Sequence, residues 1–185
     1  SRIDTSDAGF ERLNAGEMFS ADSISFPDSL KYQTLTNKRT VYGGGGIMPD
    51  IFVPMDTSSY YRYYNKLRRN NIIYNYVLDY IDQNRKNIQK QFSDFHKFNK
   101  KFEVTDIMIN EIVANGEKEG IEKDEESLSF TEKNMKREIK AYIARDIYSQ
   151  NDFYKILLQD DKAIIKALDV IKNQNEYNSL LISME

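Results

Sequence analysis

The placement of proline constrains the fold of this chain more than any other feature. All three prolines lie before residue 55, and none occurs between Thr57 and Glu185, where only two of the eight glycines stand. Proline costs about 3 kcal/mol inside a helix, because it lacks the N–H donor and clashes with the preceding turn. We therefore predict a helical domain over residues 57–185, preceded by a polar loop and β segment over residues 1–56.

Apolar residues in the proline-free stretch recur with the 3.6-residue period of an amphipathic helix. One stripe begins at Tyr60, Tyr64 and Leu67, stops at the polar residues 68–71, and resumes at Ile73. Thr105 is placed to cap a second helix that ends near residues 115–116. The first stripe is expected to continue through Val77, Tyr80 or Ile81, and Ile88 to Phe92 and Phe95.

Three further helices are predicted towards the C-terminus. Ser129 and Glu132 have the spacing of a capping box, which predicts a helix start at Ser129. A short helix is expected from Asn151 or Asp152 to Leu158, and a last one from Asp160 or Asp161. The residues expected to face inward are Met135, Ile139, Tyr142 or Ile143 and Ile147 in the first, and Ile164 or Ile165, Leu168 and Ile171 in the last.

Short strands are predicted only in the N-terminal part. Residues 31–35 and 39–42 are rich in β-branched and aromatic side chains, and they favour a hairpin about Thr36-Asn37-Lys38. Residues 51–53 would form a third short strand. The predicted fold class is therefore mainly α: an antiparallel domain of four to six helices after a short β-hairpin and loop segment.

Half of the glycines stand in one run, Gly43–Gly46. A P-loop would place a lysine and a hydroxyl residue after its last glycine, but Ile47 and Met48 follow here. A dinucleotide-binding turn would open a helix, but Pro49 and a strand-like stretch follow. We interpret the run as a connector between strands and expect no nucleotide cofactor.

The wider segment from Ser29 to Pro54 resembles the downstream end of the protease core in the tail-specific, or carboxy-terminal processing, serine peptidases. Asn37-Lys38-Arg39 stands where many members have Ser-Gly-Arg. The helical continuation is similar to the C-terminal extension of Bacteroidetes-type members. The signature residues are Arg39, Gly43, Gly44, Gly45, Gly46, Ile47, Pro49 and Asp50.

The resemblance implies that the chemistry lies elsewhere. Members of that family use a serine nucleophile activated by a lysine, with a PDZ domain before them, and all of these precede the glycine-rich signature. No segment before Gly43 matches them. We therefore expect a fragment that is inactive alone and that packs on, regulates or dimerises a parent peptidase. Its partners would be the missing core and PDZ domain, and its location the periplasm or cell envelope.

Few chemical sites can be built from the residues themselves. The chain has no cysteine, which excludes thiolate chemistry, disulfides and Cys-ligated zinc. His96 is the only histidine, and we expect it on a helix surface rather than in a triad. The acidic stretch 117–126 favours a solvated linker over a catalytic carboxylate pair. We predict no catalytic residue, metal ligand or cofactor in this chain.

Composition also limits the partners. The net charge is −3, and no run approaches the ~20 apolar residues that would span a bilayer. Neither nucleic-acid binding nor membrane insertion is therefore expected. The aromatic and cationic stretch 60–69 nevertheless favours an anchor for protein contacts. The predicted interface residues are Tyr60, Tyr61, Tyr63, Tyr64 and Arg68.

Two alternatives to the peptidase fragment remain from the residues alone. The helical region would be a self-sufficient partner-binding module, or an independent enzyme that uses carboxylates. The unpaired edges of an isolated hairpin also favour recruitment of another strand. We therefore predict that the fragment pairs these strands with a second copy as a homodimer, or leaves them poorly ordered.

Overall fold

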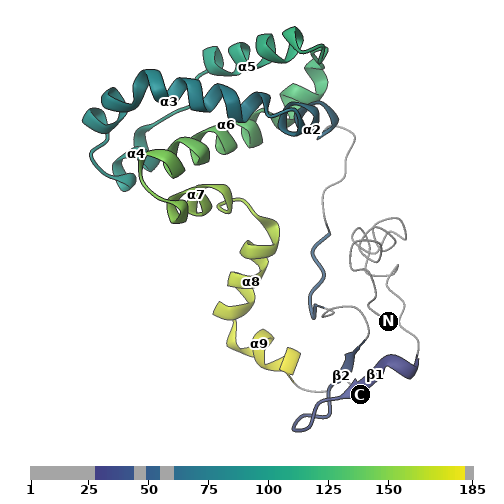
Figure 1. Ribbon diagram of the computed structural model, residues 1–185. Helices are drawn as coiled ribbons and strands as arrows, with labels where there is room; N and C mark the ends of the chain where they lie inside the picture. The colour runs from purple at the N-terminus through teal and green to yellow at the C-terminus, as the bar shows by residue number, and fades with distance from the viewer. Residues whose placement is uncertain (1–27, 44–48, 55–60, 182–185) are drawn as a thin grey trace, which may run out of the picture. The chain divides into compact units, whose positions relative to one another are not determined.

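The computed structural model describes residues 28–43, 49–54 and 61–181 (Figure 1). The chain divides into two compact units. A helical unit comprises Ser58–Asp161, and a terminal unit combines Ser1–Thr57 with Lys162–Glu185. The first boundary lies beside the one expected from the proline pattern, whereas residues 162–185 belong to the terminal unit. The predicted fold class, mainly α with a short β-hairpin, is confirmed for the described residues.

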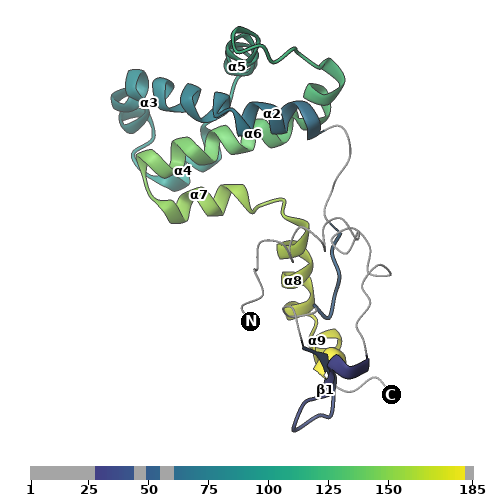
Figure 2. The same ribbon diagram turned by 45° about the vertical axis from the view of Figure 1, so that its right-hand side comes forward.

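The helical unit contains six described helices around α6. They are α2 (Arg62–Arg69), α3 (Ile72–Gln91), α4 (Phe95–Lys101), α5 (Asp106–Lys118), α6 (Glu125–Ile147) and α7 (Gln150–Leu157). Helix α6 packs against α2, α3 and α7, and α5 packs against α3. Helices α5 and α7 lie on opposite sides of the α3–α6 pair in both views (Figures 1 and 2).

The direction of packing differs from one helix pair to another. Contacts of α3 with α6 advance together along both helices, from Tyr74–Tyr142 to Arg85–Asp146, so these two run parallel. Helices α6 and α7 run antiparallel, because Tyr142 contacts Phe153 while Arg137 pairs with Asp160 beyond the end of α7. The expected antiparallel arrangement thus holds for α6 and α7, which are consecutive in the sequence. Helices α3 and α6 run parallel, and α4 and α5 lie between them in the sequence.

The core of the helical unit follows the predicted apolar stripes. Leu67, Ile73, Val77 and Ile81 are buried on α2 and α3, and Phe92 closes that stripe just after α3. On α6 the buried apolar side chains include Met135, Ile139 and Ile143. Phe98 stacks on Phe102 at 4.6 Å between ring centroids. The buried positions on α2, α3 and α6 were located by their periodicity, whereas Phe98 and Phe102 were not part of a predicted stripe.

Side-chain caps mark the start of four helices in this unit, α4, α5, α6 and α7. Thr105 accepts from the Met108 amide at 3.4 Å, as predicted. The Ser129 cap was wrong: the N-cap of α6 is Asp124, five residues earlier, which accepts from the Ser127 amide at 2.9 Å. Asp124 offers a charged acceptor before two acidic first-turn residues, which favour the positive end of the helix dipole. Ser149 caps α7.

The terminal unit holds the hairpin and the last two helices. Strands β1 (Lys31–Gln33) and β2 (Thr40–Tyr42) pair antiparallel with Tyr32 opposite Val41, after a short 3-10 turn, η2 (Asp28–Leu30). The hairpin is as predicted, but residues 51–53 are not a strand, because the described sheet pairs only β1 with β2. The last two helices are α8 (Lys162–Lys172) and α9 (Gln174–Leu181). An ion pair between Lys166 and Glu176, at 2.8 Å, holds them together.

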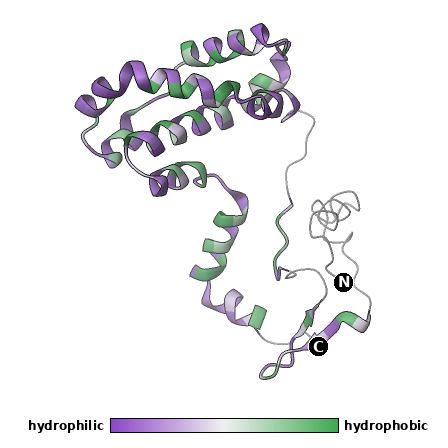
Figure 3. Ribbon diagram, viewed as in Figure 1, coloured by the Kyte–Doolittle hydropathy of each residue, from purple (hydrophilic) through white to green (hydrophobic). Residues whose placement is uncertain are grey.

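Helix α8 carries the clearest exception to the predicted burial. Ile165, Leu168 and Ile171, expected inward, are 44%, 48% and 64% exposed, and Val170 is the buried residue. Apolar residues are visible along α8 in Figure 3. A periodic apolar face predicts that something covers it, but not that the cover is part of the same chain. Among the described residues, no helix is both long and apolar enough to cross a membrane.

Candidate binding site

The signature residues that the structure describes have structural contacts in the terminal unit. Arg39 pairs with Asp50 at 3.0 Å, so two residues of the signature meet although eleven positions separate them. Arg39 also donates through Nη1 to the Leu180 carbonyl at 2.9 Å, at the end of α9. Pro49 lies beside Asp50, whereas Gly44, Gly45, Gly46 and Ile47 lie outside the described residues.

Gly43 lies close to an aromatic ring. A Cβ on this residue would lie 2.8 Å from Cε2 of Tyr32, on the facing strand. Its amide also donates to the Leu30 carbonyl at 2.8 Å. The glycine therefore lets the chain leave β2 directly over the Tyr32 ring. These contacts are packing and hydrogen-bond contacts within the hairpin.

The tyrosines predicted as interface anchors mostly face the interior of the helical unit. Tyr63 and Tyr64 are buried, so their rings are unavailable to a second chain. Tyr61 is half-buried, and its hydroxyl accepts from Asn134 Nδ2 at 2.8 Å. Tyr60 lies outside the described residues. Among the described members of the predicted set, Arg68 alone keeps substantial exposure, at 51% of its side chain.

Arg68 belongs to a hydrogen-bond network around a buried carboxylate. Glu138, 3% exposed on α6, accepts from the Tyr64 hydroxyl at 2.5 Å and from Arg68 Nε at 2.9 Å. The Tyr142 hydroxyl donates to the same carboxylate at 3.3 Å. A buried carboxylate is tolerated when it is paired and hydrogen-bonded in this way. The network therefore holds α2 against α6.

The network shifts the titration of its members. Burial, followed by the charge of Glu138, raises the pKa of Tyr64 far above its ordinary value. The same two causes raise the pKa of Tyr142. For Arg68, burial acts to lower the pKa, but Glu138 outweighs it and the net shift is upward. Both tyrosines therefore stay neutral donors and Arg68 stays charged.

A cavity of about 530 Å³ opens beside this network. Residues from the α2–α3 junction and from α6 line it, and three of them are arginines. The junction bends because Asn71 adopts a left-handed conformation, with φ of 58°. The lining residues are Asn65, Arg68, Arg69, Asn71, Ile73, Tyr74, Glu138, Tyr142 and Arg145.

Arg145 sits among aromatic rings in the helical unit. Its Cζ lies 5.3 Å from the ring centroid of Tyr74, 5.0 Å from that of Tyr142 and 5.7 Å from that of Phe153. Each ring face attracts the guanidinium through its quadrupole. The rings restrict the orientation of the guanidinium without neutralising its charge. The side chain is thus held for donation to an anion.

A second cavity, of about 390 Å³, lies between α6 and the end of α7, and its cations are partnered. Lys140 donates to the Asn99 carbonyl at 2.8 Å, and burial lowers its pKa. Lys136 pairs with Asp106 and Glu132, and Arg137 pairs with Asp160. This cavity therefore offers less uncompensated charge than the one beside Glu138.

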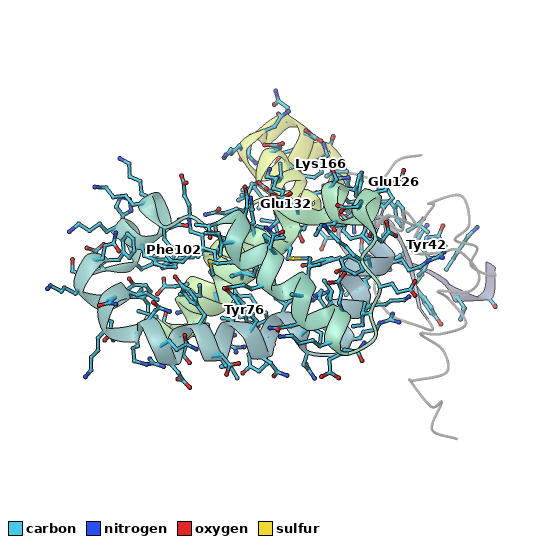
Figure 4. All side chains as sticks on the ribbon, turned by 90° about the horizontal axis from the view of Figure 1, so that it is seen from above. Tyr42, Tyr76, Phe102, Glu126, Glu132 and Lys166 are labelled. Carbon is cyan, nitrogen blue, oxygen red and sulfur yellow. The ribbon has the colours of Figure 1, made fainter. Side chains whose placement is uncertain are left out.

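Two features of the described part of the chain bear on the residues considered for catalysis or metal binding. His96 is exposed on α4, as expected. No group of three or more His, Asp or Glu residues there is arranged to hold a metal ion. Tyr76 donates to Glu111 at 2.6 Å across α3 and α5, in a helix-to-helix contact (Tyr76 is labelled in Figure 4).

Residues 63–149 are similar to a family of unknown function, DUF8443. The matched stretch runs from α2 to just before α7, and it contains every residue that lines the cavity beside Glu138. No similar curated protein and no similar solved structure was found. The family match thus coincides with most of the helical unit.

Sequence reasoning missed most of this site. Arg68 was singled out, but Glu138, Tyr142 and Arg145 were not treated as site residues. A signal was present: Glu138 falls one residue before Ile139 and three after Met135, inside a buried stripe. An acidic residue in such a position requires a partner, but its identity depends on which helix packs there.

Proposed function

We propose that this chain is the C-terminal region of a tail-specific serine peptidase, without that enzyme's catalytic Ser/Lys pair, and that it serves in protein contacts. The observation that supports a contact role best is the exposed apolar face of α8. Ile165, Leu168 and Ile171 recur at helical spacing on one short helix. Exposed apolar groups that form a stripe are typical of interaction surfaces, whereas scattered ones are not.

The signature contacts in the terminal unit are consistent with a remnant of a larger β structure. The described hairpin has two strands of three residues each, and a two-stranded hairpin is marginally stable by itself. Arg39 and Asn37 bind it to the last carbonyls of α9. The proposed partner is the protease core, with its PDZ domain, in the periplasm or cell envelope.

Two measurements test this proposal. The coding sequence upstream of Ser1 should encode a PDZ domain and a Ser/Lys segment, and the purified chain should not hydrolyse casein. Peptide hydrolysis that is lost on mutating one of the chain's own serines would contradict the proposal.

The apolar face can be tested by association with the upstream polypeptide. Replacing Ile165, Leu168 and Ile171 by serine should weaken binding by at least about tenfold, since about 1.4 kcal/mol is sufficient for that change. Asp169→Ser, at an exposed polar position of the same helix, is the matched control. Equal binding by the triple variant and the control would show that the apolar face of α8 is not the contact surface.

A stand-alone interaction module is the second candidate function. The observation that favours it is the continuous buried core within Ser58–Asp161, which extends from Tyr63 to Ile156. If the helical unit is such a module, it should capture a partner without the peptidase core. If it is only a packing element, capture should require the upstream polypeptide.

A further inference from the structure

We propose that the cavity beside Glu138 binds the carboxylate side chains of an acidic peptide segment in a partner protein. The site lies wholly in the helical unit, between the α2–α3 junction and α6. It does not involve the apolar face of α8, so it stands or falls independently of the peptidase assignment. Three features of the cavity support the proposal: an excess of positive charge, arginine donors that are held in place, and arginines that are exposed at its edge.

The cavity has more cationic than anionic groups. Arg68, Arg69 and Arg145 line it, and Glu138 is the carboxylate among the lining residues. Glu138 is already engaged by Arg68. Within the described ranges, no carboxylate pairs with Arg69 or Arg145. By contrast, Arg85 on α3 pairs with Asp146, and Arg137 on α6 pairs with Asp160.

Two of the arginines are held in place before any ligand arrives. Arg68 uses Nε for Glu138, and within the described ranges no acceptor binds its Nη groups. Arg145 is enclosed by three aromatic rings. A planar guanidinium binds a carboxylate through two parallel N–H donors, and restricting it beforehand reduces the entropy cost of binding.

The lining of the cavity also suits a peptide. Tyr74 and Tyr142 provide apolar surface for side-chain methylenes, and Asn65 and Asn71 add amide groups that can bind a peptide backbone. The volume of about 530 Å³ accommodates a few side chains. Arg68 and Arg69 are exposed, so a ligand can reach them from the surface of the unit.

Charge distribution favours a peptide over a nucleic acid. A nucleic-acid strand requires a positive surface that follows successive phosphates. This chain has a net charge of −3, and two described arginines without a carboxylate partner, Arg69 and Arg145, line the same cavity. A local pair of unpaired guanidinium groups matches two carboxylates of a short acidic segment.

The experiment measures fluorescence anisotropy of labelled probes with the full 185-residue chain. The probes are a short fluorescein-labelled peptide of alternating Glu and Gly, its Gln counterpart, and an oligothymidine of similar length. The Glu peptide should bind at least about tenfold more tightly than the Gln peptide. Its affinity should also fall as salt is raised, because the contacts are charged and surface-accessible.

Variants then test whether the Glu peptide binds in the cavity. Arg69→Gln and Arg145→Met should each weaken binding of the Glu peptide by roughly tenfold, as expected when a charged hydrogen bond is removed. Arg85→Met is the matched control, since it removes a paired arginine outside the cavity. Thermal unfolding checks that each variant folds, and Arg69→Gln alters an exposed side chain that has no packing role.

Three results would overturn the proposal. One is equal affinity for the Glu and Gln peptides, or no binding of either. Another is unchanged binding by both Arg69→Gln and Arg145→Met. The third is tighter binding of oligothymidine than of the Glu peptide, with loss in Arg145→Met, which would assign the cavity to nucleic acid. None of these results bears on the association measured through α8.

Discussion

At the scale of single residues, two adjacent tyrosines have opposite hydrogen-bond environments. The Tyr64 hydroxyl donates to Glu138 at 2.5 Å. The Tyr63 hydroxyl is buried and has no hydrogen-bond partner in the described part of the chain. A buried hydroxyl without a partner carries a desolvation cost, whereas one that satisfies a buried carboxylate contributes to stability.

This difference predicts opposite effects for the same chemical change. Tyr63→Phe should raise the free energy of unfolding by about 0.5–1 kcal/mol, because it removes an unsatisfied hydroxyl. Tyr64→Phe should lower it by about 1–3 kcal/mol, because Glu138 loses a donor. Urea unfolding followed by circular dichroism measures both. A loss of stability in Tyr63→Phe as large as in Tyr64→Phe would contradict the assigned environments.

The pH dependence of stability follows from the same residues. Burial, with a smaller effect of Glu117, raises the pKa of Tyr63 to about 12, above the ordinary value of 10.0. Because the folded-state pKa is raised, the folded protein holds the Tyr63 proton more tightly than the unfolded chain does. This contribution to the free energy of unfolding is fully present below pH 10 and is lost as pH rises towards 12. Unfolding should therefore become easier between these two values, and the decline should be shallower in Tyr63→Phe. A decline of the same steepness in both proteins would refute the Tyr63 contribution.

At the scale of elements, the start of α6 shows how capping competes between neighbouring candidates. Asp124 and Ser129 both precede plausible first turns, but only Asp124 caps the helix. Glu125 and Glu126 then occupy the first turn, where negative charge is favoured. Thr131, two residues after Ser129, lies buried inside the helix and donates to the Ser127 carbonyl at 2.6 Å.

The two candidate caps can be separated by mutation. Asp124→Ala should lower the free energy of unfolding by about 1 kcal/mol, because the Ser127 amide loses its acceptor. Ser129→Ala should change it by less than about 0.5 kcal/mol, since Ser129 is exposed inside the helix. Chemical denaturation of both variants gives the comparison. A larger effect of Ser129→Ala would restore the original capping-box prediction.

At the scale of the whole molecule, the division into units implies that the helical unit can fold alone. Its buried core, from Tyr63 to Ile156, is contained in Ser58–Asp161. We expect the excised segment 58–161 to be helical and to unfold in one cooperative transition, as single domains of this size usually do. Heating followed by circular dichroism tests this, with the full chain as control. A gradual, non-cooperative loss of signal from the excised segment would show that it depends on the rest of the chain.

The sequence by itself determined the helical class, the stripes of the core and the hairpin. Each of these depends on neighbours a few positions apart: proline and glycine usage, a 3.6-residue repeat, and β-branched residues on either side of a turn. The exposed face of α8 marks the limit of such reasoning. A stripe shows that Ile165, Leu168 and Ile171 share one side of a helix, but it does not show what covers that side.

Only the tertiary structure decided the candidate site. Arg68, Glu138 and Arg145 come from α2 and from α6, and they meet because α2 and α3 both pack against α6. No local pattern encodes that pairing, because it arises from how the buried faces of distant helices fit together. The same packing turned Tyr63 and Tyr64 inward and left Arg69 and Arg145 without carboxylate partners in the described ranges.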